Sequence, residues 1–267
     1  MANKLNVKIG DIAYDCRYLI EGPESSENNI LVNCVEYKKA SIFFNYILDL
    51  FRAEINRIEI NLNRLNNIKL FISEPCFNKV QKITLLGNSV PAKKVIDLYD
   101  CFDKPVLETI VESHINLNPT SKLLQSEILQ LFKAPFISLE HLLAFSGKYI
   151  DLSSSSILEE HIIAFVKHWL DGNYPTLEGA CISCPMELEY ETEKVLDEFN
   201  TKRWNPAERA QSFIFKTSFS DDEKDGFPII DCSNGNDLER NDGLMATMQF
   251  EDHDRSFLFC VWQTRFP

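Results

Sequence analysis

The residues best suited to metal or redox chemistry are two cysteines in a C-x-x-C spacing, Cys181 and Cys184. A structural zinc site would need a second ligand pair at suitable spacing. The nearest upstream histidines, His161 and His168, are seven residues apart in a segment with helical periodicity, whereas metal-binding histidine pairs on a helix usually stand at i and i+4. We interpret both histidines as structural and expect no metal and no cofactor. A zinc or redox role for the cysteines is the less favoured alternative.

Motifs of the common enzyme classes do not occur in the sequence. There is no G-x-x-x-x-G-K-[ST] loop, no G-x-G-x-x-G, no G-x-S-x-G and no H-E-x-x-H. The run Ser153 to Ser156 is better interpreted as a strand-to-helix turn, with Ser156 as the helix cap, than as a nucleophile. We therefore expect no catalytic residues and no enzyme. The alternative is an enzyme whose Cys and His residues meet only in the folded chain.

Composition indicates a folded protein with little attraction for nucleic acid. The 267 residues are 45% hydrophobic and 25% charged, which is ordinary for a globular protein with a real core. The net charge of −13 opposes contacts with phosphates, and the Lys and Arg residues are scattered. Acidic residues concentrate in Glu187 to Glu198 and in Asp221 to Asp242. We interpret both stretches as solvated faces, with a docking site for a basic partner as the alternative.

The sequence contains no recognisable signal for secretion or membrane insertion. Met1 to Leu5 lack the apolar region of a signal peptide, and no run approaches the roughly 20 apolar residues that cross a bilayer. The eight cysteines are spread over a long chain, which favours free buried thiols over disulfides. We therefore expect a cytoplasmic or nuclear protein that does not contact membranes.

Residues 1–60 are expected to form strands and one helix. Alternating apolar residues predict a hairpin over 5–20 with its turn at Gly10-Asp11, followed by a strand over 30–35. A helix is expected to begin at Ser41, because the apolar residues after it follow a helical spacing.

Residues 187–267 are expected to form a helix and then antiparallel β-strands. The helix is predicted over 187–202, where Leu188 belongs to its apolar face. Asp242-Gly243 predicts a turn between strands. The last strand, over 257–262, is apolar on both faces, which indicates an inner strand of a sheet.

Residues 61–186 hold an internal repeat. Three times an apolar triplet is followed by a turn, a helix and a second apolar stretch that begins Leu-Glu, and the triplets recur after 32 and 35 residues. Such a period is typical of stacked repeats. We predict the α/β fold class, with strand–helix repeats resembling a short leucine-rich-repeat array; chance spacing in another α/β protein is the alternative. The triplets are Ile83-Thr84-Leu85, Ile115-Asn116-Leu117 and Ile150-Asp151-Leu152, and the Leu-Glu pairs begin at Leu107, Leu139 and Leu177.

The clearest single element is a helix in the third repeat. Ser156 and Glu159 are placed as a capping box at its start, and Asp171-Gly172 as its end. Its apolar residues form one stripe at helical spacing. The stripe consists of Leu158, Ile162, Phe165, Val166, Trp169 and Leu170.

Residues 136–184 contain short motifs in a specific order. A Leu-Leu stretch precedes an Ile-x-Leu triplet, a helix ending in Lys-x-Trp, a Gly/Asn turn and Pro-x-Leu-Glu. In this order they resemble the type 2 F-box-associated domain, a diversifying nematode family. The stretches Asp237 to Thr247 and Val7 to Cys34 also resemble that family, so we predict a single F-box-associated region over 1–267. The central motifs stand at Leu142-Leu143, Ile150, Lys167-His168-Trp169, Gly172-Asn173 and Pro175-Thr176-Leu177-Glu178.

The resemblance implies a protein-interaction module that recognises a substrate for a cullin-based ubiquitin ligase. In that family an F-box binds the Skp1-type adaptor, but strand-like sequence here begins at Leu5 and no F-box is recognisable. Adaptor binding is therefore expected only if an F-box is supplied. The alternatives are that the chain binds its partner without recruiting a ligase, or that an F-box was lost from the gene or from the gene model. The protein partner and the residues that bind it are unknown from the sequence, and a non-functional paralogue is a further alternative.

Overall fold

The computed structural model divides the chain into two units, which are described separately. One unit holds residues 1–56 and 65–80, and the other holds residues 57–64 and 81–267. The described residues are 3–9, 12–19, 29–32, 45–46, 49, 57–65, 67–72, 77, 79–112, 114–115, 117–216, 227–251, 253 and 255–263.

The first unit contains a three-stranded antiparallel sheet in the order β1-β2-β3. Asn3 pairs with Tyr18 and Ile9 pairs with Ile12, so the predicted hairpin is confirmed in the strands that are described. Of the predicted helix after Ser41, residues 45, 46 and 49 are helical, and Ser41 itself lies outside the described residues. The elements are β1 (Asn3–Ile9), β2 (Ile12–Leu19), β3 (Asn29–Val32) and the short helix α2 (Ile68–Ile72).

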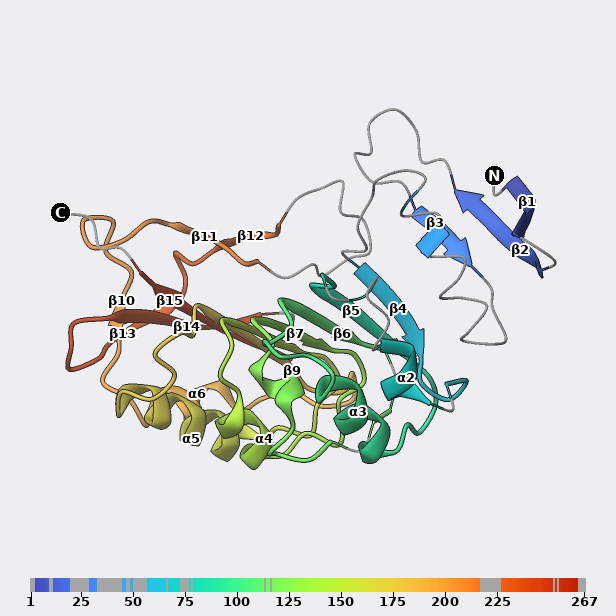
Figure 1. Ribbon diagram of the computed structural model, residues 1–267. Coiled ribbons are helices and arrows are strands. Elements are labelled where there is room, and N and C mark those ends of the chain that lie inside the picture. The colour runs from blue at the N-terminus through green and yellow to red at the C-terminus, as the bar shows by residue number, and fades with distance from the viewer. Residues whose placement is uncertain are drawn as a thin grey trace. The chain divides into compact units, whose positions relative to one another are not determined.

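The second unit is built on a ten-stranded sheet, one half of which is parallel (Figure 1). Six strands pair in the order in which they occur along the chain, each parallel to the one before it. They are β4 (Arg57–Asn61), β5 (Lys82–Leu86), β6 (Glu108–Val111), β7 (Ile128–Leu131), β8 (Tyr149–Leu152) and β9 (Gly179–Ser183).

The helices of this unit lie along one face of the sheet (Figure 1). Crossovers between parallel strands are nearly always right-handed, so a sheet that grows in one direction places all its crossovers on the same side. The crossovers contain α3 (Ala92–Tyr99), a 3-10 turn (Lys122–Gln125), α4 (Leu139–Ala144) and α5 (Glu159–Leu170).

The predicted repeat period is wrong. The first and third triplets lie in β5 and β8, but Ile115 of the second forms only an isolated parallel bridge with Val90. The strands recur at register positions 57, 82, 108, 128, 149 and 179, a shorter and less regular step. Glu108 of the first Leu-Glu pair begins a strand, whereas Leu139 of the second begins a helix. Four-residue apolar runs cannot be assigned to strand or helix by periodicity, and the likeness to leucine-rich repeats is not confirmed.

The other half of the sheet is antiparallel, as predicted for the C-terminal strands. The last strand lies between β9 and β14, which confirms that it is an inner strand. Gly243 has φ +86° in the turn before β14, where glycine tolerates a left-handed backbone that other residues adopt at a cost. The strands are β10 (Lys202–Arg203), β13 (Asn236–Glu239), β14 (Met245–Glu251) and β15 (Ser256–Trp262).

Two apolar layers cover the two faces of this sheet. On the helical face the rings of Phe165 and Trp169 pack edge-on against Phe259 of β15, at centroid distances of 5.5 and 5.3 Å. On the opposite face the ribbon of β11 (Ser212–Ile214) and β12 (Ile229–Asp231) buries Phe213 and Ile230 in a cluster that includes sheet residues such as Leu258. The α5 stripe is therefore a core element.

Three details of the predicted helices are corrected. Leu158 precedes α5 and is 43% exposed, so it does not belong to the buried stripe. Ser156 does not cap the helix: its hydroxyl donates to the carbonyls of Pro135 and Ile137, and Nδ1 of His161 accepts the Leu158 N–H at 3.1 Å. The helix predicted over 187–202 shortens to α6 (Thr192–Leu196).

Among the described residues, no helix has the length and apolar character needed to cross a membrane.

Candidate functional site

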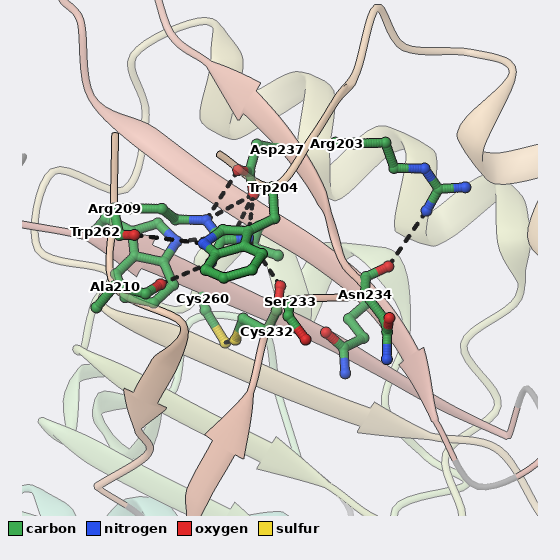
Figure 2. A network of polar contacts seen from close by, with 12 residues as sticks. Arg203, Trp204, Arg209, Ala210, Cys232, Ser233, Asn234, Asp237, Cys260 and Trp262 are labelled. Carbon is green, nitrogen blue, oxygen red and sulfur yellow. Dashed lines mark hydrogen bonds and ion pairs between the residues drawn. The ribbon is translucent and has the colours of Figure 1, made fainter. Parts of the chain in front are cut away.

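A polar network in the C-terminal half surrounds Arg209, whose side chain is fully buried (Figure 2). Its Nε and Nη2 donate to the carboxylate of Asp237 at 2.8 to 2.9 Å. Nη1 donates to the Ala210 carbonyl and Nη2 donates also to the Cys232 carbonyl, each at 2.8 Å. A guanidinium that is fully buried and paired with a carboxylate is not available to an incoming ligand.

The network continues into two neighbouring strands. Thr247 donates its hydroxyl to Asp237 at 2.7 Å and accepts the indole N–H of Trp262 at 2.8 Å. The Arg209 guanidinium carbon lies 4.8 Å from the centroid of the Trp262 ring, a cation–π contact. Side chains from β13, β14 and β15 are thus joined to the loop that carries Arg209. We interpret this network as structural, because its side chains use their hydrogen-bonding groups on one another.

A second group of contacts, made by Arg240, connects the end of β13 with the C-terminal end of α5. Arg240 lies over the ring of Trp169 with its guanidinium carbon 4.9 Å from the centroid. Its Nη1 donates to the carbonyls of Trp169 and Asn173 at 3.4 Å, and its other nitrogens bind Asp242 at 2.8 and 3.0 Å. A cation at the C-terminal carbonyls of a helix is favourable. The predicted motif at Lys167-His168-Trp169 is therefore explained by packing.

Asp151 and Cys181 form a buried polar pair on neighbouring strands. Asp151 is 6% exposed, and Nε2 of Gln130 donates to it at 3.4 Å. Burial raises the pKa of Asp151 to about 6, with hydrogen bonds from Gln130 and Cys181 opposing the rise. Burial, followed by the nearby Asp151 charge, raises the pKa of the Cys181 thiol well above its usual value. A thiol in that state is a weak nucleophile at neutral pH.

The C-x-x-C pair does not form a joint site. Cys181 lies in β9 beside Asp151, whereas the Cys184 thiol donates to the Leu188 carbonyl at 3.1 Å. Cys101, Cys181, Cys184, Cys232 and Cys260 are free thiols. Within the part of the chain that the structure describes, no three His, Cys, Asp or Glu side chains gather in a way that could hold a metal ion.

Three of the five histidines, His141, His161 and His168, have structural partners. His141 is buried, with Nε2 2.9 Å from the Leu117 carbonyl and Nδ1 2.8 Å from the Ser138 hydroxyl. Its position three residues after Ser138 matches that of His161 after Leu158, where Nδ1 accepts a helix-start N–H. His168 stacks edge-on with Tyr174 at 4.8 Å. The interpretation of His161 and His168 as structural agrees with these contacts.

An open hollow of about 590 Å³ lies between α6 and the edge of the antiparallel strands. Arg203 donates to the Asn234 carbonyl at 3.3 Å, and Nε2 of Gln249 donates to Glu251 at 2.7 Å, whereas Oε1 of Gln249 is buried without a hydrogen-bond partner. The lining combines polar side chains with the apolar Leu196 and Phe250 and contains neither Cys nor His. The lining residues are Thr192, Leu196, Arg203, Asn234, Asn236, Gln249, Phe250 and Glu251.

Residues 119–182 match the F-box associated family. The resemblance predicted from the sequence is confirmed for this segment, which holds β7, β8, α4 and α5. An uncharacterised protein of Caenorhabditis elegans is 28% identical over 75% of this chain, and a second one from the same organism is 28% identical over 56%. The chain spans 46% and 33% of the length of these two relatives. No solved structure matches the chain.

Three large apolar side chains are exposed within the F-box associated segment and just after it. Leu158 is 43% exposed, Met186 is 80% exposed and Leu188 is 51% exposed. We call these three residues the apolar patch. The sequence pattern missed it, because Leu158 and Leu188 were both assigned to buried helix faces. The alternation of Met186 and Leu188 with Glu187 and Glu189 is the signal that could have indicated it.

Proposed function

We propose that this chain is a protein-interaction module that recognises a protein substrate for an F-box type of ubiquitin ligase. The observation that carries the proposal is the match of residues 119–182 to the F-box associated family. That family connects the segment with F-box proteins, and a recognition role is the function such a segment would serve beside an F-box.

The chemistry of the described residues supports binding over catalysis. The buried Arg209 is occupied by Asp237 and by main-chain carbonyls. Burial raises the pKa of Cys181 and of Cys184, which keeps both thiols protonated at neutral pH. Exposed large apolar side chains, in contrast, are characteristic of surfaces that bind other proteins.

Ligase recruitment is the second part of the proposal. A Skp1-type adaptor would bind an F-box, and we propose adaptor contact only for a form of the protein that carries one. The relatives are longer than the stretch they share with this chain, so the comparison also extends to proteins with additional sequence. Cytoplasmic or nuclear location, which is where such ligases act, remains part of the proposal.

The test uses the full chain in Caenorhabditis elegans, the organism of the two relatives. The chain is expressed with a defined F-box fused to it and, in parallel, without the fusion. Proteins cross-linked to both forms are identified, and their ubiquitin content and half-life are measured. We expect at least one protein that binds both forms and gains ubiquitin only with the fusion.

Two results would count against the proposal. If proteins bound by the fusion keep the same ubiquitin content and half-life as without it, substrate recognition for a ligase is wrong. If no protein binds above an unrelated carrier of equal net charge, the interaction module itself is wrong. The carrier of equal charge is needed because a net charge of −13 attracts cationic proteins without specificity.

A further inference from the structure

We propose that the apolar patch formed by Leu158, Met186 and Leu188, with the carboxylates around it, docks a cationic amphipathic segment of a protein partner. The inference rests on the proposed interaction function and assigns to it a surface and a partner chemistry. It follows from the position of the three side chains, from the way their loop is held and from the charges beside them.

The three apolar side chains belong to one surface. The segment before α5 runs beside the segment after β9, and two contacts connect them. The Ser155 N–H donates to the Ser183 carbonyl at 2.9 Å, and the Glu191 N–H donates to Oε1 of Glu159 at 2.9 Å. Leu158 lies between these contacts on one segment, and Met186 and Leu188 lie between them on the other.

The loop that carries Met186 and Leu188 is held in place. The Leu188 N–H closes a turn on the Pro185 carbonyl at 3.0 Å, and the Cys184 thiol donates to the Leu188 carbonyl at 3.1 Å. Cys184 itself is buried beneath the loop. A surface that is already ordered loses less conformational entropy when a partner binds. Met186 adds a flexible, polarisable side chain that adapts to different apolar partners.

Most of the charges around the patch are negative. Two cations lie nearby: Lys194, and Arg255, whose main-chain carbonyl accepts the Cys184 N–H at 3.0 Å. Glu160, Glu187 and Glu189 are exposed and form no ion pair with another described residue, while Lys194 of the neighbouring helix pairs with Glu159 at 4.0 Å. Burial alone would raise the pKa of Glu159, but hydrogen bonds from backbone N–H groups and the Lys194 charge lower it below its usual value. Glu159 is therefore anionic at neutral pH. An apolar centre with a carboxylate rim is complementary to an amphipathic segment that carries Lys or Arg.

The same charges argue against other occupants. An anionic lipid surface and a second copy of this chain, whose net charge is −13, would both be repelled by the carboxylate rim. A neutral apolar segment would form no ion pairs with the carboxylates around the patch. The cationic amphipathic segment is the occupant that uses both the apolar side chains and the carboxylates.

The test measures binding of the full chain to a defined probe. The probe is a fluorescent synthetic peptide of about 16 residues with leucine on one helical face and lysine on the other. An analogue with glutamate in place of lysine is the peptide control. Affinity is measured by fluorescence anisotropy at about 0.15 M and about 0.5 M salt, because screening separates the charge contribution from the apolar one.

Matched variants separate the patch from the net charge. Glu187→Lys with Glu189→Lys and the control Asp103→Lys with Glu112→Lys change the net charge equally, and all four carboxylates are exposed. Met186→Ser with Leu188→Ser is compared with Ile96→Ser, because Ile96 is an exposed apolar residue of α3. We expect each patch variant to weaken lysine-peptide binding by about tenfold or more and each control by less than about twofold.

Several outcomes would overturn the inference. Equal losses in the patch and control variants would show attraction to net charge alone. Binding of the glutamate analogue would refute the charge complementarity. A dimer in size-exclusion chromatography that Met186→Ser with Leu188→Ser dissociates would assign the patch to a second copy. Binding to anionic vesicles that is lost in the same variant would assign it to a membrane.

The proposed function and this surface can fail separately. If the partners found in cells bind the two patch variants as well as the unchanged chain, the surface is wrong and the interaction function stands. If the lysine peptide requires the patch but no cellular protein gains ubiquitin, the surface stands and the ligase function is wrong.

Discussion

The guanidinium carbon of Arg240 lies 4.9 Å from the centroid of the Trp169 ring, and Nη1 of the same side chain donates to the Trp169 carbonyl at 3.4 Å. Trp169 lies in the last turn of α5, within the F-box associated segment, and Arg240 directly follows strand β13. The contact therefore joins the central segment that resembled the family to the C-terminal stretch that also resembled it, between residues 71 positions apart.

Replacing Arg240 with Met is expected to lower the free energy of unfolding by about 2 kcal/mol, because the cation–π contact and the interaction with the helix C-terminus are both lost. Arg240→Lys should lose about half of that, since an ammonium keeps the charge but not the planar pairing with Asp242. Urea unfolding followed by tryptophan fluorescence measures both variants, because Trp169, Trp204 and Trp262 all lie in the second unit. Equal stability of Arg240→Met and the unchanged chain would show that the contacts of Arg240 with Trp169 do not stabilise the fold.

Removing Arg209 alone should be more damaging than removing its whole ion pair. Arg209→Met leaves the Asp237 carboxylate buried without its cation, which costs about 3–5 kcal/mol. Arg209→Met combined with Asp237→Leu replaces the pair with apolar groups and should recover a large part of that loss. The double-mutant cycle is measured by urea unfolding, with the exposed Arg203→Met as a control that changes stability by less than about 0.5 kcal/mol. Strictly additive losses would show that the pair is not coupled.

Stability should depend on pH through Asp151. Burial raises its folded pKa to about 6 from an ordinary value of 3.8, so the folded chain holds the proton more tightly than the unfolded chain. Folding stability from this group is therefore greatest below about pH 4, falls as the pH rises to about 6, and is constant above that. At about 1.4 kcal/mol per pKa unit, the loss is on the order of 3 kcal/mol.

Asp151→Asn removes this titration while keeping a side chain of the same shape. The difference in unfolding free energy between Asp151→Asn and the unchanged chain should shift in favour of the variant by about 2–3 kcal/mol between pH 4 and pH 7. Urea unfolding across that range measures it, and the exposed Asp103→Asn is the matched control. A difference that does not change with pH would show that Asp151 titrates normally.

Gly147 should tolerate no side chain. A Cβ at this position would lie 2.9 Å from the Glu127 carbonyl and would also overlap the carbonyl oxygen of Ser126 and the ring of Phe145. Because two of these atoms belong to the backbone, Gly147→Ala is expected to cost more than about 3 kcal/mol. At Gly172 a Cβ meets nothing within 4 Å and only the φ of +89° is unfavourable, so Gly172→Ala should cost about 1 kcal/mol. Thermal unfolding compares the two, and similar losses would contradict the steric argument.

Local patterns were sufficient for the elements with strong periodicity. Ile162, Phe165, Val166 and Trp169 of the predicted stripe are buried, as their helical spacing indicates. A strand that is apolar on both faces was correctly placed inside the sheet, because only an inner strand covered by two layers buries both of its faces.

Short elements were beyond the same reasoning. Four-residue strands such as β6 and β7 are too brief for period 2 to be distinguished from period 3.6. The predicted spacing between successive strands was therefore wrong, and Ile115, which forms only an isolated bridge, was assigned to a strand. Leu188 fits a helical face by spacing, but the backbone turns at Pro185 to Leu188 and exposes the side chain.

The sequence by itself determined the α/β class, the antiparallel C-terminal strands and the resemblance to the F-box associated family, since each depends on neighbouring residues. Only the tertiary structure decided three relationships: the hydrogen bonds between Arg209 and Asp237, the contact of Arg240 with Trp169, and the surface shared by Leu158 and Leu188. Those relationships join positions that are distant in sequence. Side-chain distance and burial are properties of the packed chain, and no local pattern specifies them.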